Sequence, residues 1–347
     1  MNKKRFLAVL LGIFVSALML AGCDKKIYIT TGLKDTELFK LSGEACRLSE
    51  VLLVLMTEKS RYEEELGSDI WVSENWNIDI TLEDEIKQKV KNEMVELKSI
   101  ARFADNQKLA LSEDEKTAIS NAAAEFYATF SDEQKELLGV TLEDIESLYT
   151  SFYKAEKVYE KLTADAEAEV SDEAARVIEV NYIFIATCKL DENNNKIQYT
   201  EEELAAANEK LTKVQEALSI GSDFKSLAEQ YSDSTEYSRK FARGEMLESI
   251  EKVAFELKDG EISEAIQTDD GYYFLYCVSD YLKTETEVKK AEMENDIRKE
   301  AYNSIYTPFK SEQTLEFNSD RWEDIKLSDY EAVDTTELYS IYNKWMQ

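Results

Sequence analysis

Four cysteines are the most reactive side chains in this 347-residue sequence, and the chain contains no histidine to act with them. The missing imidazole excludes a Ser-His-Asp or Cys-His catalytic site and a zinc ion held by histidine. It also excludes a histidine switch near neutral pH. Any catalysis by this chain must therefore proceed without an imidazole.

The first cysteine, Cys23, closes a segment with the pattern of a secretory signal. Three basic residues at positions 3–5 precede an uncharged, mostly apolar run over residues 6–20, which is shorter than a typical membrane-spanning helix. The run ends in Leu-Ala-Gly-Cys at residues 20–23, a pattern that resembles a bacterial lipobox. The resemblance implies that residues 1–22 are a lipoprotein signal peptide and that Cys23 is lipidated and anchored to the membrane. An uncleaved N-terminal anchor is the alternative.

The remaining thiols, Cys46, Cys188 and Cys277, do not form a disulfide framework, because they are odd in number and irregularly spaced. We predict that they are buried free thiols. The polar run Asp-Glu-Asn-Asn-Asn at residues 191–195 is compatible with a calcium site, but a solvated loop is the favoured interpretation. We therefore predict neither a metal nor a cofactor.

Acidic side chains dominate the composition, with 72 Asp and Glu against 41 Lys and Arg and a net charge of −31. A nucleic-acid-binding protein needs a basic face, so this balance argues against a nucleic-acid partner. Anionic lipid would repel the same surface, so we expect the body of the protein to stand off from the membrane.

The elements that must position any site are mostly helical, because ten glycines and one proline leave few turn-forming residues. We predict a helix over residues 43–66 and a longer one from about residue 81, both with apolar residues at helical spacing. Capping boxes at residues 112–115 and 131–134 open two more helices, and Thr141 caps another. The predicted buried faces of these helices carry Val51, Leu52, Leu55, Leu82, Ile86, Val90, Met94, Leu97, Ile119, Ala122, Ala123, Phe126, Leu142, Ile145, Leu148, Phe152 and Leu162.

The hydrophobic period changes from helical to alternating near residue 177. Alternate residues from Ile178 to Ala186 are apolar or aromatic, so this face of a predicted strand should meet a core along its whole length. The residues between them begin polar and become apolar, so the second face should be covered only toward the end of the strand. The elements predicted after it are helices over about residues 200–219, 224–231 and 247–255 and an aromatic closing strand over residues 271–278.

Helical spacing returns over residues 284–306, and Pro308 should end or kink that helix. Short β-prone patches lie at residues 27–31 and 315–317, and a last helix closes the chain. The predicted inner faces carry Met293, Ile297, Ala301 and Ile305 in the first of these helices, and Leu338, Ile341, Tyr342 and Trp345 in the last.

These patterns predict an α+β fold in which a βα module is inserted into a mainly helical domain. We place an N-terminal helical segment at residues 23–175, the module at 176–283, and at 284–347 a C-terminal helical segment that packs on the N-terminal one. A solute-binding lipoprotein would need two repeated βαβ lobes. A single βα module makes that class the least favoured alternative.

Short motifs stand in a fixed order inside the module. Gly-Ser-Asp-Phe at 221–224 is followed by Tyr-Ser-Asp at 231–233, then Phe-Ala-Arg-Gly-Glu-Met at 241–246, Gly-Glu-Ile-Ser at 260–263 and Gly-Tyr at 271–272. Each motif alone is weak, but the ordered set resembles the parvulin family of peptidyl-prolyl isomerases. The whole layout resembles the extracytoplasmic foldases of the PrsA and SurA type, in which a parvulin module is inserted into a helical chaperone domain.

Residue by residue, the resemblance implies an apolar pocket for the client's proline. Met246 falls on the family's pocket methionine, and Phe241 falls on the aromatic residue ahead of it. Ile250 stands where the family usually has a phenylalanine, so the pocket remains apolar but loses a ring.

The polar positions of the family site carry hydroxyls in this sequence. The two family histidines fall on Tyr182 and Tyr273, the cysteine or aspartate falls on Ser234, and Thr268 falls on the site threonine. The family's Gly-Gly-Asp-Leu-Gly turn is replaced by a shorter stretch without glycine over residues 234–241.

The resemblance also carries an expectation about strand pairing. If Tyr182 lies opposite Tyr273 in an antiparallel pair, Cys188 falls past one end of the pair and Cys277 toward the other. The two thiols would then be too far apart for a disulfide.

Loss of histidine does not by itself exclude prolyl isomerisation, because no covalent bond is broken. The barrier is amide resonance, about 18–20 kcal/mol, and a catalyst must bind the twisted amide better than the planar one. An apolar pocket favours the less polar twisted state, and neutral hydroxyl donors can add to this. The alternative is that the two bulky tyrosine rings simply fill the groove as ordinary sheet packing.

We therefore expect a membrane-anchored extracytoplasmic foldase, a peptidyl-prolyl cis-trans isomerase of the parvulin type. Its partners would be unfolded or partly folded secreted polypeptides, together with the membrane through Cys23. The alternative is a catalytically inactive parvulin-like chaperone that binds the same clients.

Overall fold

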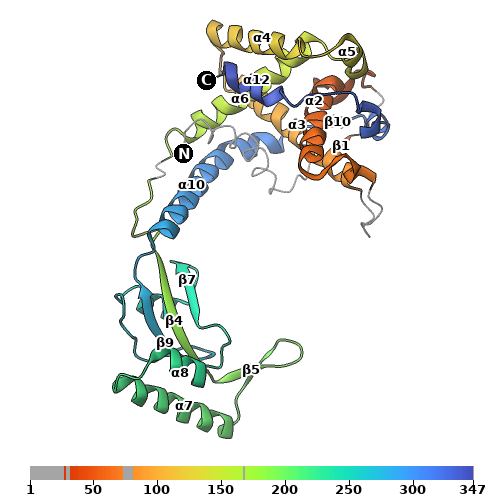
Figure 1. Cartoon of the computed structure of the whole chain (residues 1–347). Helices are drawn as coiled ribbons and strands as arrows, with labels where there is room; N and C mark the ends of the chain where they lie inside the picture. The colour runs from red at the N-terminus through yellow and green to blue at the C-terminus, as the bar shows by residue number, and fades with distance from the viewer. Residues whose placement is uncertain (1–26, 29–31, 73–80, 167–168, 347) are drawn as a thin grey trace. The chain divides into compact units, whose positions relative to one another are not determined.

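The structure is a computed structural model that places two compact units along the chain, Met1–Asp165 with Glu300–Gln347, and Ala166–Lys299. Figure 1 shows that the first unit is mainly helical and that the second holds a small sheet with helices. The predicted signal peptide and Cys23 lie outside the described residues. The residues described are 27–28, 32–72, 81–166 and 169–346.

The first unit combines long helices with one small sheet, as the α+β prediction requires. The N- and C-terminal segments of the chain fold together in this unit. Its elements are β1 Ile27–Tyr28, β2 Glu37–Leu41, β3 Glu44–Arg47, α2 Leu48–Leu66, the 3-10 helix η2 Ser68–Val72, α3 Leu82–Asn106, α4 Glu113–Tyr127, α5 Asp132–Leu138, α6 Leu142–Thr163, β10 Leu315–Phe317, α11 Ser319–Glu323, the 3-10 helix η3 Leu327–Tyr330 and α12 Leu338–Trp345.

Helix starts in this unit follow the capping signals of the sequence. The side-chain oxygens of Thr81, Ser112, Ser131 and Thr141 each accept a hydrogen bond from the backbone N–H three residues later. Each cap satisfies a backbone donor that has no partner within the helix. The predicted starts of α3, α4, α5 and α6 are therefore confirmed.

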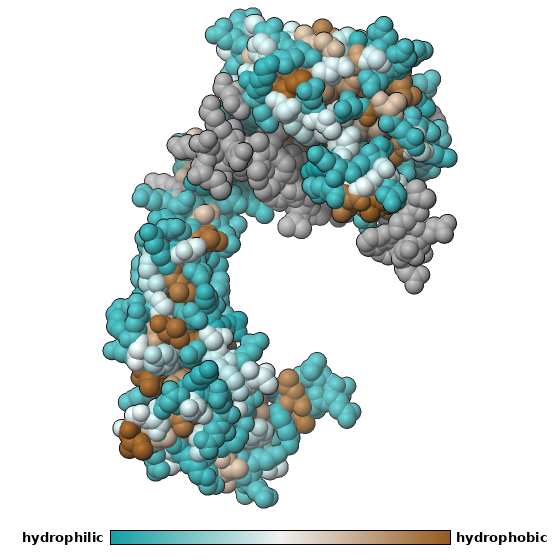
Figure 2. Space-filling view, viewed as in Figure 1, coloured by the Kyte–Doolittle hydropathy of each residue, from teal (hydrophilic) through white to brown (hydrophobic). Residues whose placement is uncertain are grey.

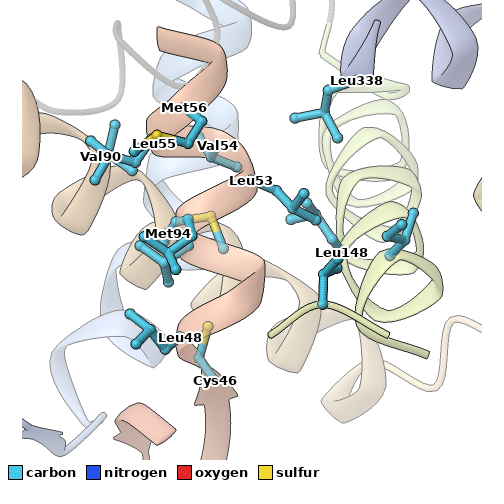
Figure 3. Close-up of a cluster of buried hydrophobic side chains, with 14 of the residues drawn as sticks. Cys46, Leu48, Leu53, Val54, Leu55, Met56, Val90, Met94, Leu148 and Leu338 are labelled. Atoms are coloured by element: carbon cyan, nitrogen blue, oxygen red, sulfur yellow. The ribbon is translucent and has the colours of Figure 1, made fainter. Parts of the chain in front are cut away.

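Helix α2 is the centre of the helical core. Its residues from Leu48 to Lys59 are all buried, so the prediction of a single buried face was wrong. The run is apolar almost all round, and such a helix is stable only when other elements surround it. Figure 3 shows side chains of α3, α6 and α12 packed around α2, with Met94, Leu148 and Leu338 among them.

The sheet of this unit has the strand order β1-β10-β2-β3. Strand β10, near the C-terminus, pairs antiparallel with β2 and parallel with β1, so the two ends of the chain are joined in one sheet. Strand β2 was not predicted from the sequence, and residues 44–47 were predicted as part of a helix although they form β3. Strand pairing outweighs helical spacing here, because a four-residue strand carries little pattern of its own.

Helix α10, Lys283–Ser311, is longer than predicted, and Pro308 lies inside it. Pro308 has no N–H to donate to the carbonyl of Ser304, so one hydrogen bond is missing there, and the helix ends three residues later. The predicted inner face was wrong as well: Tyr302 and Tyr306 are buried, whereas Ile297 and Ile305 are 36% and 48% exposed. In the last helix the prediction was better, since Leu338, Ile341 and Tyr342 are buried and only Trp345 is exposed at 36%.

The second unit is the βα module, and we call it the module from here on. Its four-stranded sheet has the order β7-β4-β9-β8, and every pairing in it is antiparallel. Its elements are β4 Val177–Ala186, β5 Cys188–Leu190, β6 Lys196–Gln198, α7 Glu201–Ser219, α8 Phe224–Tyr231, β7 Ser238–Ala242, α9 Glu248–Ala254, β8 Ile266–Gln267 and β9 Gly271–Ser279.

Strand β4 divides the module into two apolar clusters, one on each face of the sheet. Ile183 and Ile185 point to the cluster under α7 and α8, which confirms the prediction that this face is covered toward the strand's end. Ile178 and Val180 point to the cluster that contains residues of α9. We call the second side, which carries Ile178, Val180, Tyr182 and Phe184 of β4, the site face.

The site face is covered only along the first half of β4. Ile178 and Val180 are buried, but Tyr182 and Phe184 keep part of their surface exposed. The neighbouring strand β7 pairs with β4 only from Val177 to Asn181. The prediction of a core along the whole length of this face was therefore wrong, and the uncovered half holds the aromatic residues of interest.

The remaining thiols and the polar loop have simple structural roles. Cys46 and Cys277 are buried and Cys188 is half-buried, and all three are free. Residues 191–195 form the turn between β5 and β6, in which the Asp191 carboxylate accepts hydrogen bonds from the backbone N–H groups of Asn193 and Asn195. Within the described ranges, no three metal-ligating side chains cluster, and no helix has the length and apolarity to cross a bilayer.

The viewed surface of each unit is mostly hydrophilic, and its apolar side chains lie in small separate patches (Figure 2). This is the surface expected for a chain with so large an excess of acidic residues.

Candidate functional site

Two tyrosines lie side by side on the site face. The ring centroids of Tyr182 and Tyr273 are 6.0 Å apart, with an angle of 45° between the rings. Tyr273 lies opposite Phe184, and Tyr182 lies opposite Leu275, so the expected direct opposition of the two tyrosines was wrong. An irregularity between Glu179 and Val180 shifts the register of this strand pair. The tyrosines remain diagonal neighbours on one face.

The loop after α8 brings a serine to this pair. The Oγ atom of Ser234 lies 3.3 Å from the hydroxyl oxygen of Tyr182 and accepts a hydrogen bond from the backbone N–H of Glu236. The preceding residues fix the loop against β4: Ser232 Oγ accepts from the N–H of Phe184, and the N–H of Asp233 donates to the carbonyl oxygen of Phe184 at 2.7 Å. The loop thus occupies the edge of β4 where β7 has ended.

Thr268 lies beside the pair but its hydroxyl is engaged in a turn. Its Oγ1 atom donates to the carbonyl oxygen of Gly271 at 3.0 Å and accepts from the N–H of Asp270 at 3.3 Å. This turn joins β8 to β9 and sets the position of Tyr273 two residues later. Tyr182, Ser234 and Tyr273 are therefore brought together as one hydroxyl cluster, and Thr268 supports it.

The predicted pocket residues form the floor and one wall of the site face. Phe241 and Ile250 are each only 1% exposed and belong to the buried cluster. Met246 packs against the same cluster but keeps part of its surface exposed, as do Tyr182 and Tyr273. Met246 and the two tyrosines are therefore the accessible part of this surface, with Phe241 and Ile250 buried in the cluster behind them.

A tight turn after β7 positions Met246. Gly244 has a φ of +82°, a conformation that favours glycine. The carboxylate of Glu245 accepts from the N–H of Ala242 at 2.9 Å, and that of Glu251 accepts from the N–H of Gly244 at 2.7 Å. These bonds hold the Arg-Gly-Glu-Met motif in a fixed shape.

Two further residues of the site face were missed by sequence reasoning. The ring of Phe184 lies 4.6 Å from that of Tyr273, which fixes one side of the tyrosine. Arg239 lies opposite Val180 in the β7–β4 pair and has an exposed side chain. The alternating pattern of β4 contained the signal for Phe184, whereas β7 was not recognised as a strand, so nothing placed Arg239 on this face.

The hydroxyl of Tyr273 stays protonated at neutral pH. Burial raises the pKa of Tyr273 above its usual value, and the neighbouring Tyr182 and Asp270 add to the increase. Arg239 acts in the opposite direction. A phenol with a raised pKa is a neutral hydrogen-bond donor, which is the form that a non-covalent catalyst of amide rotation can use.

Taken together, these residues provide an apolar surface bordered by neutral hydroxyl donors. The site has no nucleophile activated by a base and no group of metal ligands among the described residues. Such a surface can hold an apolar ring and donate hydrogen bonds to a polypeptide backbone.

Comparison with known proteins identifies the family of the module. Residues 183–279 match the family model described as rotamase, PPIC-type PPIase domain, which covers β4 from Ile183 to the end of β9. The module thus contains a parvulin-type domain.

Curated relatives include foldases of the same type. The chain is 29% identical over 154 residues to foldase protein PrsA 3 of Bacillus anthracis, a match that covers 42% of this chain and 53% of the relative. It is 24% identical over 205 residues to foldase protein PrsA of Halalkalibacterium halodurans, covering 56% of this chain and 58% of the relative. The chain spans about half the length of the curated relatives it matches. It is similar to parvulin-type, PrsA-like foldases.

Solved structures that the chain matches include PrsA from Bacillus cereus, at 18% identity and a TM-score of 0.30, covering 84% of this chain and 93% of that one. Another is one of the SurA-like chaperones of Campylobacter jejuni, at 11% identity and a TM-score of 0.29, covering 82% of this chain and 99% of that one.

Proposed function

We propose that the protein is an extracytoplasmic foldase whose module catalyses peptidyl-prolyl cis-trans isomerisation in secreted clients. The observation that carries this proposal is the joint presence of a parvulin-type domain and a hydroxyl cluster beside Met246 on the uncovered half of the site face. The clients would be unfolded or partly folded polypeptides with accessible prolines.

The proposed mechanism requires no proton transfer. The proline ring of the client would lie against Met246, above Phe241 and Ile250. In an apolar surrounding the planar, resonance-stabilised amide loses more stabilisation than the twisted one, because the planar form is the more polar. Tyr273 and Tyr182 would donate hydrogen bonds to the backbone around the twisting bond, and preorganised donors of this kind need no rearrangement during the reaction.

The position of the protein in the cell is part of the same proposal. The Leu-Ala-Gly-Cys pattern at residues 20–23 supports a lipid anchor at Cys23, on the outer side of the cell membrane. The helical unit would then bind segments of the client while the module acts on its prolines. The large negative charge would keep the complex soluble and favour basic segments of clients.

One observation favours a second candidate, a chaperone with an inactive module. Phe184 and Tyr273 stack at 4.6 Å, and the rings of Tyr182 and Tyr273 lie 6.0 Å apart, so aromatic side chains occupy much of the uncovered half of the site face. If they leave no room for a proline ring, client binding would persist without isomerisation.

A paired assay separates the two candidates. The full chain in detergent would be tested for isomerisation of a proline-containing peptide in a protease-coupled assay, and for suppression of light scattering by an aggregating client. A saturable rate above background supports the isomerase. Suppressed aggregation without any such rate would instead support the inactive chaperone.

A further inference from the structure

Arg239 occupies a position on the site face that no part of the proposed mechanism uses. It lies opposite Val180 in an antiparallel pair, so the two side chains project to the same face. Val180 and Tyr182 are two residues apart in β4 and share that face. Arg239 and Tyr182 are thus diagonal neighbours across the strand pair, about 7–8 Å apart at Cα, a separation that a long side chain spans.

The guanidinium of Arg239 is free to meet a ligand. Its side chain is exposed, and it takes part in no ion pair among the described residues. The basic residues next to it are engaged: Lys240 contacts Glu285 at 2.7 Å, and Arg243 contacts Glu173 at 2.5 Å. Arg239 also lies near enough to Tyr273 for its charge to lower the pKa of that hydroxyl. The hydrogen bond from Lys289 lowers the pKa of Glu245, and the charge of Arg239 adds to this, so Glu245 lies within electrostatic range of Arg239. Glu245 forms its ion pair with Lys289, and Arg239 therefore keeps an exposed charge beside the hydroxyl cluster.

The chemistry of amide rotation gives such a cation a role. As the prolyl amide twists, resonance is lost and the lone pair returns to the nitrogen atom, which becomes a hydrogen-bond acceptor. Arginine carries five N–H donors and remains charged at every physiological pH. A donor aimed at charge that develops only in the transition state accelerates the reaction without tightening substrate binding.

We propose that Arg239 is a catalytic residue of the isomerase reaction, whose guanidinium donates a hydrogen bond to the client's prolyl nitrogen as the amide twists. This inference rests on the proposed function. It adds a hydrogen-bond donor at a position that none of the family motifs assigns. No covalent bond to the client is formed or broken.

The test measures kcat and KM separately for the full chain and three variants. Arg239→Ala should lower kcat about tenfold with little change in KM, because the contact is made in the transition state. Arg239→Lys should retain part of the activity, since a charged donor remains. The matched control is Lys240→Ala. Lys240 is the next residue of β7, its side chain projects to the opposite face, and it binds Glu285. The Lys240→Ala variant should therefore keep the wild-type kcat. Far-UV circular dichroism would show that each variant keeps its fold.

The outcomes separate this inference from the proposed function. An active wild type with an equally active Arg239→Ala variant overturns the role of Arg239 and leaves the isomerase standing. A rise in KM alone would make Arg239 a client anchor, which also overturns the catalytic role. No activity in the wild type overturns the isomerase and the role of Arg239 together.

Discussion

At the scale of single residues, hydroxyl groups stand where the resembled family has imidazoles. Tyr182 and Ser234 lie within 3.3 Å of each other, and Tyr273 completes the cluster across the strand pair. None of these groups needs to change protonation in a reaction that only rotates a bond. The absence of histidine therefore constrains the mechanism to donor and packing effects.

Removing the hydroxyl of Tyr273 should slow the reaction while preserving the ring. We expect Tyr273→Phe to lower kcat/KM about fivefold, the loss of one neutral hydrogen bond worth about 1 kcal/mol. The control is Tyr276→Phe on the same strand, because Tyr276 packs in the cluster on the other face of the sheet. Equal losses in both variants, measured with the same proline peptide, would contradict the assignment.

The pH profile gives an independent prediction. Because burial raises the pKa of Tyr273 above its ordinary value, its O–H remains a donor through the neutral range. The isomerisation rate should be flat from about pH 6 to 9, and it should fall only where tyrosine ionises, near or above pH 10. The rate would be measured by NMR line-shape or exchange methods. An inflection of the rate near pH 6 to 7 would show that a group outside the proposed mechanism titrates during the reaction.

The order of motifs selected candidate residues but not their geometry. Phe241 and Ile250 lie in one apolar cluster, with Met246 packed against it, and their role as a proline pocket stays a prediction. The strand register, which places Tyr273 opposite Phe184 and Tyr182 opposite Leu275, could not be predicted from the residue pattern of either strand alone. Local spacing predicts faces of a strand, whereas register is decided by both partners together.

At the scale of secondary structure, the central pair β4–β9 determines whether the site exists. Gly271 begins β9 with a φ of +153°, and a Cβ atom there would lie 2.0 Å from the carbonyl oxygen of Ile185. Neither backbone can move without breaking the ladder between the two strands. Glycine is therefore required at this position.

Gly271→Ala should unfold the module. All four tryptophans of the chain lie outside residues 166–299, so tryptophan fluorescence follows the helical unit, while far-UV circular dichroism follows both units. The variant should lose the module's thermal transition and keep the tryptophan transition. Gly260→Ala is the matched control, since its φ is +83° but nothing lies within 4 Å of the added atom, and it should cost only about 1–2 kcal/mol. Equal effects of the two changes would show that the close approach at Ile185 is not decisive.

Helix boundaries were the most predictable elements, because caps are local. Thr81, Ser112, Ser131, Thr141 and Thr200 each cap the helix that the sequence assigned to it. Strands β2, β3, β7 and β8 were missed, since each has five residues or fewer and is stabilised by partners far away in the chain. The inner face of α10 was missed for a similar reason: Tyr302 and Tyr306 are buried by tertiary contacts rather than by the strongest apolar spacing.

Helix α3 carries a carboxylate that links stability to pH. Burial raises the pKa of Glu93 to about 7, with Glu58 adding to the increase and Lys89 opposing it. A raised pKa in the folded state means that the folded protein binds this proton more tightly than the unfolded chain. The contribution of Glu93 to stability is therefore full below about pH 4.5 and is lost as the pH rises to about 7.

Glu93→Gln should remove this dependence, because glutamine is neutral at every pH. We expect the variant to be more stable than the wild type at pH 8, by at most about 3 kcal/mol, and similar to it at pH 4.5. Thermal denaturation followed by tryptophan fluorescence would measure the difference. Glu136→Gln, at an exposed position of α5, is the control. A stability gap that is independent of pH would show that Glu93 is ionised throughout.

At the scale of the whole molecule, the chain combines a helical unit formed by both ends of the sequence with an inserted parvulin-type module. The acidic excess was readable from composition, and it agrees with the largely hydrophilic surface in Figure 2. The change in the spacing of apolar residues near residue 177 also predicted a βα module between two helical segments. The sheet that joins the two ends of the chain could not be predicted from the sequence, because its strands β2 and β10 are far apart along the chain.

The two units should carry separable functions. A Tyr182→Phe, Tyr273→Phe double variant should lose isomerisation and still suppress aggregation of an unfolded client as well as the wild type does. Light scattering of the client measures the second property. A parallel loss of both would place client binding in the module instead of the helical unit.

The most direct test of the central claim is the exchange between cis and trans forms of a proline peptide, observed by two-dimensional NMR in the presence of the full chain. The account predicts exchange cross-peaks that are absent from the free peptide, that build up with catalytic amounts of protein, and that disappear with the double variant. A wild-type chain that binds the peptide but produces no exchange would contradict it.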